Sequence, residues 1–278
     1  MPKQLQRACA LTIAGSDSGG GAGIQADLKT FAALGLHGTS VITCITAQNP
    51  KEVLGIQAVE TAMVKKQLVA VFSELRPQAV KTGLLYSVEI VREVTAFFSS
   101  VKKTPPLIID PVLVAGSGAR LLQTEAIEVL QRELLPLALL VTPNLVEAEI
   151  LLGLKIDSVG DLRKAARQVH KQFGCAALVK GGHLQRVREA VDFFYDGRTE
   201  LLLSAPFIRG MRTHGTGCTY SAAIAAYCAL GCALPKAVER GKEFITRAIG
   251  QSRRLGRHQV LNWSGMLRHG KWLMANGK

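Results

Sequence analysis

The chain has 278 residues, which is enough to bury one sizeable hydrophobic core without splitting into two domains. Its hydrophobic content of 48% fits a compact enzyme and excludes wholesale disorder. The formal net charge of +13 leaves two classes of partner open, an anionic substrate or a nucleic acid. We expect a single domain over 1–278, in which 265–278 form a basic C-terminal extension.

Three further patterns narrow the class of protein. No apolar stretch long enough for a signal peptide follows Met1, so we expect a cytoplasmic location. The uncharged stretch 215–234 is poor in Leu, Ile and Val, which favours a buried helix over a membrane span. The six cysteines show no zinc-finger spacing, so we expect neither structural zinc nor disulfides.

The positive charge is concentrated near the C-terminal end, where 240–278 contain nine Lys or Arg and one Glu. A groove for single-stranded nucleic acid would interleave basic residues with aromatic ones, and that pattern is missing from the sequence. A solvated basic face is therefore the preferred interpretation. Nucleic-acid binding is kept as a distant alternative.

Short apolar runs alternate with amphipathic segments along the chain, which predicts helices packed around a mostly parallel sheet. Strands are expected at 8–14, 40–46, 79–81, 107–110, 139–142 and 176–180, with a hairpin of 191–195 and 200–204 around Asp196-Gly197. Helices are expected at 24–34, 63–75, 88–98, 162–173, 217–230 and 236–249.

Polar residues follow or end several of the predicted strands. In open α/β sheets a ligand lies beyond the carboxyl ends of the strands. We therefore expect the site to contain the residues at those ends, which are Asp17, Gln48, Asp110, Asn144 and Lys180.

The glycine-rich segment 15–23 connects the first predicted strand to the first helix. Glycines let the backbone approach a ligand closely, and the helix start that follows attracts anions. The spacing matches neither a Rossmann fingerprint nor a P-loop. A tight structural loop without ligand contact is the alternative interpretation.

A second segment, Thr213-His214-Gly215-Thr216-Gly217-Cys218-Thr219, leads into a helix of small residues and is more specific. Glycines alternating with small polar residues at a helix start aim several backbone N–H groups at one point, which predicts an anion hole for a phosphoryl group.

The start of that helix should also lower the pKa of Cys218, which makes this thiol a candidate base for a substrate hydroxyl. Two alternatives stay open. Cys218 could be a small packing residue, or it could be the nucleophile of an acyl transferase with His214 as its partner. The second alternative lacks a third, orienting residue.

Asp110 with Asn144 and Glu147 forms a third group. Carboxylates and an amide at strand ends suit Mg²⁺ that bridges nucleotide phosphates. Asn followed three residues later by Glu is equally a helix-capping pattern. Lys180, in Lys-Gly-Gly-His, could supply a cation to phosphates or lie on the surface beside a turn.

The blocks together resemble the hydroxymethylpyrimidine/phosphomethylpyrimidine kinases of thiamine biosynthesis, which belong to the ribokinase-like superfamily. The resemblance covers 9–264, and its blocks are 10–17, 20–27, 46–49, 141–148, 180–183 and 214–219. It implies a ribokinase-like three-layer αβα sandwich with a central, mostly parallel sheet. It also implies two successive phosphoryl transfers from ATP, to the hydroxymethyl oxygen and then to the monophosphate, with Mg²⁺ as cofactor.

The resemblance assigns roles residue by residue. Gln48 reads the edge of the aminopyrimidine, because an amide both donates and accepts. Ala22 and Asp27 line or support the pyrimidine pocket. The remaining assignments are Gly215, Thr216, Gly217 and Cys218 for the anion hole and its base, Asp110, Asn144, Lys180 and Thr213 for ATP and its phosphates, and Asp110 and Glu147 for the metal.

Some positions depart from the family pattern. Ser18-Gly19 replaces a common Pro-Ser, and Thr46 and Leu84, both assigned to the substrate site, replace an aliphatic residue and a Met. These departures concern substrate preference, so pyridoxal or pyridoxine kinase is the alternative. The expected partners are a small pyrimidine alcohol and ATP, with no nucleic acid or membrane, and the expected assembly is a homodimer.

Overall fold

The computed structural model describes residues 8–114, 121–182, 184, 187–208 and 214–264. Its centre is a nine-stranded sheet in the order β3-β2-β1-β4-β5-β6-β7-β8-β9. All neighbouring strands in the run β2-β1-β4-β5-β6-β7 are parallel. At the two edges of the sheet, β3, β8 and β9 pair antiparallel with their neighbours. The strands are β1 Cys9–Asp17, β2 His37–Gln48, β3 Val53–Ala58, β4 Ala79–Thr82, β5 Leu107–Ile109, β6 Leu140–Val141, β7 Ala176–Lys180, β8 Glu189–Tyr195 and β9 Glu200–Pro206.

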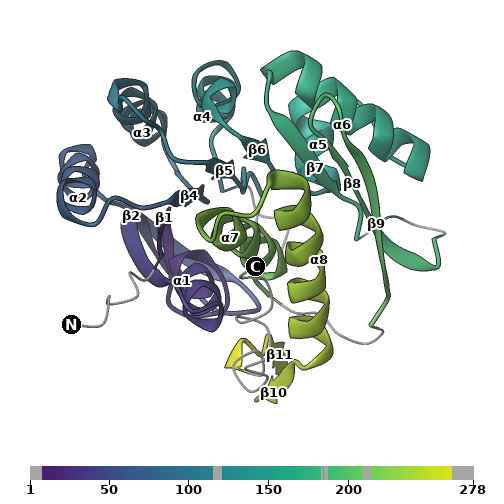
Figure 1. Ribbon diagram of the computed structural model, residues 1–278. Helices are drawn as coiled ribbons and strands as arrows, with labels where there is room; N and C mark the ends of the chain where they lie inside the picture. The colour runs from purple at the N-terminus through teal and green to yellow at the C-terminus, as the bar shows by residue number, and fades with distance from the viewer. Residues whose placement is uncertain (1–7, 115–120, 183, 185–186, 209–213, 265–278) are drawn as a thin grey trace, which may run out of the picture.

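Helices cover both faces of this sheet (Figure 1). Helices α2 to α6 lie on one face, and α1, α7 and α8 lie on the other. The helices are α1 Gly23–Ala33, α2 Thr61–Glu74, α3 Val88–Ser100, α4 Thr124–Val129, α5 Leu145–Leu152, α6 Val159–Phe173, α7 Thr216–Ala229 and α8 Leu234–Gly250. Short π and 3-10 turns, Leu130–Leu134 and Leu135–Leu137, follow α4, and a small hairpin of β10 Arg253–Leu255 and β11 His258–Val260 follows α8.

Each central strand supplies side chains to two hydrophobic clusters, because successive strand residues point to opposite faces. Leu11 and Ile13 of β1 belong to the cluster under α2 to α6, while Ala10 belongs to the cluster under α1, α7 and α8. In β5, Leu107 and Ile108 divide between the clusters in the same way. The predicted three-layer αβα sandwich with a mostly parallel sheet is confirmed.

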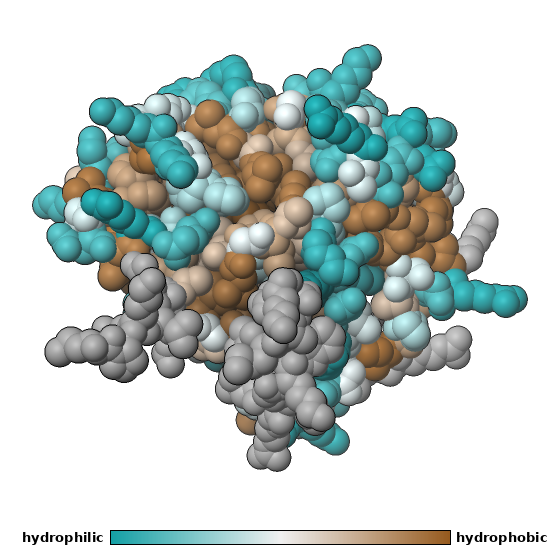
Figure 2. Space-filling model, viewed as in Figure 1, coloured by the Kyte–Doolittle hydropathy of each residue, from teal (hydrophilic) through white to brown (hydrophobic). Residues whose placement is uncertain are grey.

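Helix α7 is buried along most of its length, from Thr219 to Ala226. It lies between α1 and α8, and its small side chains let these neighbours approach closely. A Cβ on Gly241 of α8 would lie 2.6 Å from Cγ1 of Ile224. In the view of Figure 1, the molecular surface is apolar near its middle and mostly hydrophilic toward its rim (Figure 2). No helix among the described residues combines the length and the apolar character that crossing a membrane requires.

Two differences between the sequence-based expectations and the structure concern strands at the β1 and β2 side of the sheet. Strand β1 continues to Asp17 instead of ending at Ala14, so the glycine-rich connection is shorter than expected. Strand β3 was not predicted, because it is an edge strand whose side chains are mostly accessible and carry no alternating pattern. The hairpin of β8 and β9 and the two C-terminal helices are confirmed.

Replacing Gly241 by Ala should lower the free energy of unfolding by about 1–3 kcal/mol, because the new methyl group overpacks the contact with Ile224. The matched control is Gly160→Ala in α6, where a Cβ would meet only Oγ of Ser158 at 3.6 Å. The control should leave stability unchanged or raise it by up to about 1 kcal/mol, as Ala does in an open helix position. Urea denaturation measures both variants, and equal effects would contradict the packing argument.

Candidate active site

Two glycine-rich segments far apart in the sequence meet at the start of α7. Gly215 precedes the helix with φ +82°, and a Cβ on it would lie 1.7 Å from the carbonyl oxygen of Gly21. Only glycine fits this approach. The turn that begins α7 therefore rests on the loop between β1 and α1.

Asp17 holds that loop in shape. Its carboxylate accepts hydrogen bonds from the backbone N–H groups of Gly19, Gly21 and Ala22, at 2.8, 3.0 and 2.8 Å. Burial raises the pKa of Asp17, but hydrogen bonds from His214 and from the backbone outweigh burial, so the pKa lies below its usual value. The loop is thus organised around a buried anion.

Polar side chains gather where β2 ends. Nε2 of Gln48 lies 2.9 Å from Nε2 of His214. Oε1 of Gln48 lies 3.2 Å from the hydroxyl oxygen of Thr46. The same ring nitrogen of His214 lies 3.1 Å from Oδ2 of Asp17. Three segments converge here, which are the end of β1, the end of β2 and the turn before α7.

A second group lies at the carboxyl ends of β5, β6 and β7. Nζ of Lys180 donates to Oδ1 of Asp110 at 2.9 Å, and the hydroxyl of Thr142 donates to the same oxygen at 3.1 Å. Ser221 of α7 donates to Oδ2 of Asp110 at 3.2 Å. A Cβ on Gly217 would lie 3.2 Å from Nζ of Lys180, so the first turn of α7 borders this group.

The charge state of Asp110 follows from its neighbours. Burial raises the pKa of this carboxyl, but the positive charges of Lys180 and Lys81 outweigh burial and hold the pKa below its usual value. Asp110 is therefore an anion paired with Lys180. Its pairing keeps the Lys180 ammonium at the edge of the α7 turn.

Asn144 and Glu147 form a complete capping box at the start of α5. The side chain of Asn144 accepts from the N–H of Glu147 at 3.0 Å, and Glu147 accepts from the N–H of Asn144 at 2.9 Å. The capping interpretation of these two residues is confirmed. Burial, together with the charge of Asp110, raises the pKa of Glu147 to about 7 in spite of the opposing effect of Lys180.

Asp27 lies deeper than a pocket-lining residue. It is completely buried, and its carboxylate pairs with Nζ of Lys81 at 2.8 Å and accepts from the hydroxyl of Thr12. This position fits support from beneath the site and not contact with a ligand. Leu84 is also buried, and its side chain packs near Gly15 at the end of β1.

Cys218 lies in the first turn of α7, where the residue is only partly exposed and the thiol is largely shielded from water. The expectation of a lowered pKa is wrong, because burial raises the pKa of this thiol to about 11. The ammonium of Lys81 acts in the opposite direction, while the carboxylates of Asp110 and Asp27 add to the increase. Desolvation thus outweighs the helix start, and Cys218 is a thiol at neutral pH.

The structure brings most of the predicted residues to the carboxyl ends of the central strands, around the start of α7. Gln48, Ala22 and Thr46 lie toward the β1 and β2 side, and Asp110 and Lys180 toward the β5 to β7 side. Thr213 and His183 lie outside the described residues. Sequence reasoning missed the contacts made by Lys81, Thr142, Ser221 and His214, of which Thr142 and His214 belonged to motifs that it singled out.

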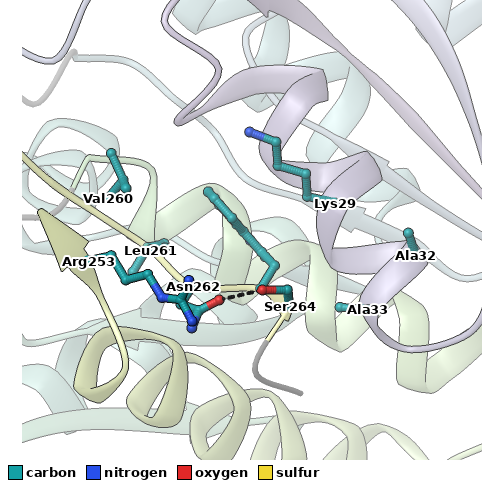
Figure 3. A pocket seen from close by; sticks show the side chains of 9 residues that line it. Lys29, Ala32, Ala33, Arg253, Val260, Leu261, Asn262 and Ser264 are labelled. Atoms are coloured by element: carbon teal, nitrogen blue, oxygen red, sulfur yellow. Dashed lines mark hydrogen bonds between the residues drawn. The ribbon is translucent and has the colours of Figure 1, made fainter. Parts of the chain in front are cut away.

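A cavity of about 400 Å³ lies away from these residues, between α1 and the segment after β11 (Figure 3). Trp263 in its wall donates from Nε1 to the hydroxyl of Thr219, and Nζ of Lys29 lies 4.8 Å from the centroid of the Trp263 ring. None of the predicted site residues lines it. The lining residues are Lys29, Ala32, Ala33, Arg253, Val260, Leu261, Asn262, Trp263 and Ser264.

Comparison with known proteins identifies the family. Residues 17–262 match the family model described as phosphomethylpyrimidine kinase. The chain belongs to this family. A hydroxymethylpyrimidine/phosphomethylpyrimidine kinase of Synechococcus elongatus is 46% identical over 250 residues, which are 90% of this chain and 94% of that protein.

One further relative and one solved structure extend this comparison. The thiamine biosynthesis bifunctional protein ThiED of Geobacter sulfurreducens is 47% identical over 90% of this chain, and the chain spans 51% of its length. The solved structure of an ADP complex of Bacillus subtilis pyridoxal kinase superposes with a TM-score of 0.86 at 37% identity, over 95% of this chain and 100% of that one. That likeness agrees with the predicted ribokinase-like fold.

We expect iodoacetamide to alkylate Cys218 slowly at pH 7, because the raised pKa leaves little of the reactive thiolate. The rate should rise about tenfold for each pH unit from 7 to 9, since deprotonation is the limiting event. A peptide covering 213–223 is the matched control and should react faster at pH 7, because its cysteine is not buried. Mass spectrometry of the proteolytic fragment that contains Cys218 measures the rate. A rate independent of pH would indicate that Cys218 is already a thiolate at pH 7.

Proposed function

We propose that the protein transfers the terminal phosphoryl group of ATP to the hydroxymethyl oxygen of 4-amino-5-hydroxymethyl-2-methylpyrimidine, and then phosphorylates the monophosphate to the diphosphate. The observation that carries the proposal is the position of the α7 turn, which borders Gln48 and Asp17 on one side and Asp110 and Lys180 on the other. Relatives named for this activity support it. The reaction belongs to thiamine biosynthesis.

The α7 turn acts on the phosphoryl group in transfer. Charge is spread over three equatorial oxygens in a loose transition state, so preorganised N–H donors at Gly215, Thr216, Gly217 and Cys218 provide the main stabilisation. Lys180 adds a positive charge next to Gly217. Asn144 and Thr213 complete the proposed contacts with ATP.

Cys218 takes the proton of the substrate hydroxyl in this proposal. Only the thiolate can accept this proton, so the Cys218 thiol, whose pKa is about 11, first releases its own proton to water, and it accepts the hydroxyl proton late in a loose transition state. Lys81, whose charge lowers the pKa of Cys218, stabilises the thiolate before it takes the proton and returns to the thiol. Gln48 and Ala22, together with Thr46 and Leu84, hold the pyrimidine so that its hydroxyl meets this sulfur.

Asp110 and Glu147 are the residues proposed for Mg²⁺. The ion usually takes one or two carboxylates and completes its shell with phosphate oxygens and water. Within the described part of the chain, no group of three or more His, Cys, Asp or Glu could hold a metal by itself. This donor set fits an ion held mainly by the nucleotide, and when bound the ion would neutralise charge on the phosphates.

Pyridoxal kinase is the second candidate, because the Bacillus subtilis pyridoxal kinase shares the fold at 37% identity. Mass spectrometry of the products formed from each alcohol with ATP and Mg²⁺ separates the two. Conversion of the pyrimidine to its monophosphate and diphosphate is expected. A strong preference for pyridoxal, with no pyrimidine diphosphate, would overturn the proposal.

Two further expectations remain predictions, a homodimer and a cytoplasmic location. Light scattering after gel filtration tests the first, and fractionation of cells tests the second. Nucleic-acid binding through the basic C-terminal region predicts a steep dependence of affinity on salt. Such binding, without ATP turnover on any ring alcohol, would replace the kinase proposal.

Replacing Cys218 by Ala should lower kcat by about a hundredfold or more, the scale expected for a lost proton acceptor. The matched control is Cys228→Ala on the same helix, which should change kcat by less than about twofold, because this thiol lies near the other end of α7. Steady-state kinetics measures both variants. Unchanged turnover in Cys218→Ala would assign that residue to packing.

Replacing Gln48 by Leu should raise KM for the pyrimidine alcohol and leave KM for ATP nearly unchanged. A ring edge left without its hydrogen bonds costs about 1–3 kcal/mol, which corresponds to roughly 5- to 150-fold in KM. Gln57→Leu on the exposed strand β3 is the matched control and should leave both constants unchanged. Equal changes in both KM values would contradict a role in reading the ring.

A further inference from the structure

His214 has no role in the proposed reaction, although it lies between residues that have one. Its Nε2 lies 3.1 Å from Oδ2 of Asp17 and 2.9 Å from the side-chain amide of Gln48. The partners are 197 and 166 residues away in the sequence. The ring also packs against Gly21, where a Cβ would lie 2.9 Å from Cδ2 of His214.

The hydrogen bonds determine which tautomer of His214 is present. The carboxylate of Asp17 is ionised, because hydrogen bonds keep its pKa below the usual value, and it can therefore only accept. Nε2 of His214 must donate to it. A neutral His214 consequently carries its proton on Nε2.

The same reasoning determines the orientation of the Gln48 amide. A ring nitrogen that donates to Asp17 cannot also accept from an NH₂ group, so the amide oxygen of Gln48 must face His214. The amide oxygen and nitrogen are nearly identical in shape, so hydrogen-bond partners decide between them. With the oxygen toward His214, the NH₂ group faces the hydroxyl oxygen of Thr46, whose proton goes to the carbonyl of Ser16 at 2.9 Å. Each donor in this chain then has an acceptor, except the second N–H of the Gln48 amide.

We infer that His214 is a positioning residue that fixes Gln48 with its amide oxygen turned inward and one N–H free for the substrate. Gln48 then presents a donor to the ring edge, and the ring atom that it selects is an acceptor, a nitrogen with a free lone pair. This inference rests on the proposed function, because it names how the same pocket reads its ring. The link through Asp17 also ties ring reading to the α7 turn, since His214 immediately precedes Gly215.

Two substitutions of His214 separate hydrogen bonding from shape. His214→Phe keeps a flat ring but removes the donor, and His214→Gln restores an N–H near the place of Nε2. His214→Phe should raise KM for the pyrimidine alcohol about tenfold, with KM for ATP unchanged within about twofold. His214→Gln should return KM to within about threefold of the wild type.

The decisive comparison uses two substrate analogues, in each of which one ring nitrogen is replaced by C–H. The wild type should disfavour one of them by about tenfold or more, and His214→Phe should reduce that preference to less than about threefold. The matched control is His170→Phe on α6, whose ring contacts the carbonyl of Cys175 and the ring of Tyr195, and it should leave the preference unchanged. A preference that persists in His214→Phe, or a loss that His214→Gln does not reverse, would overturn the inference.

Nitrogen-15 NMR of the free protein tests the inference without any substrate. The ring of His214 is expected to carry its proton on Nε2, alone or together with Nδ1, and a neutral ring protonated only on Nδ1 would overturn the assignment. Wild-type turnover of the pyrimidine alcohol is measured separately. Its absence would remove the proposed function, while the NMR result would still decide the hydrogen-bond arrangement.

Discussion

The site depends on a backbone contact that only glycine permits. The carbonyl oxygen of Gly21 occupies the place where a side chain on Gly215 would begin. Through this contact, the loop organised by Asp17 and the first turn of α7 share one location. Gln48 at the end of β2 and Lys180 at the end of β7 then lie on opposite sides of the same turn. The residues proposed for ring recognition and those proposed for phosphate binding therefore lie next to each other.

Paired buried charges determine the chemistry around that turn. Asp27 with Lys81 and Asp110 with Lys180 are ion pairs with buried carboxylates, and unpaired charges at such depth would be strongly unfavourable. The pairs hold two ammonium groups close to the start of α7. They also surround Cys218 with both signs of charge, so desolvation decides its protonation state. The sulfur is consequently a thiol in the free protein, and the proposed role as proton acceptor requires that it first lose its own proton to water.

Local patterns were enough to predict much of the fold and part of the site. The alternation of apolar runs predicted the layers, and Asn144 with Glu147 predicted a capping box, because both depend on residues close in sequence. The glycines before α7 predicted a helix start that aims N–H groups at one point. Strand β3 was missed because an exposed edge strand has no buried face to produce a pattern.

The sequence by itself determined the order of the elements, the motifs at the strand ends and the family to which they belong. Only the tertiary structure decided that His214 contacts both Asp17 and Gln48, that Lys81 lies beneath the site, and that the pKa of Cys218 is raised. Turns and caps follow from neighbours along the chain. Hydrogen-bond partners and pKa values depend instead on burial and on charges contributed by distant segments, which no local pattern contains.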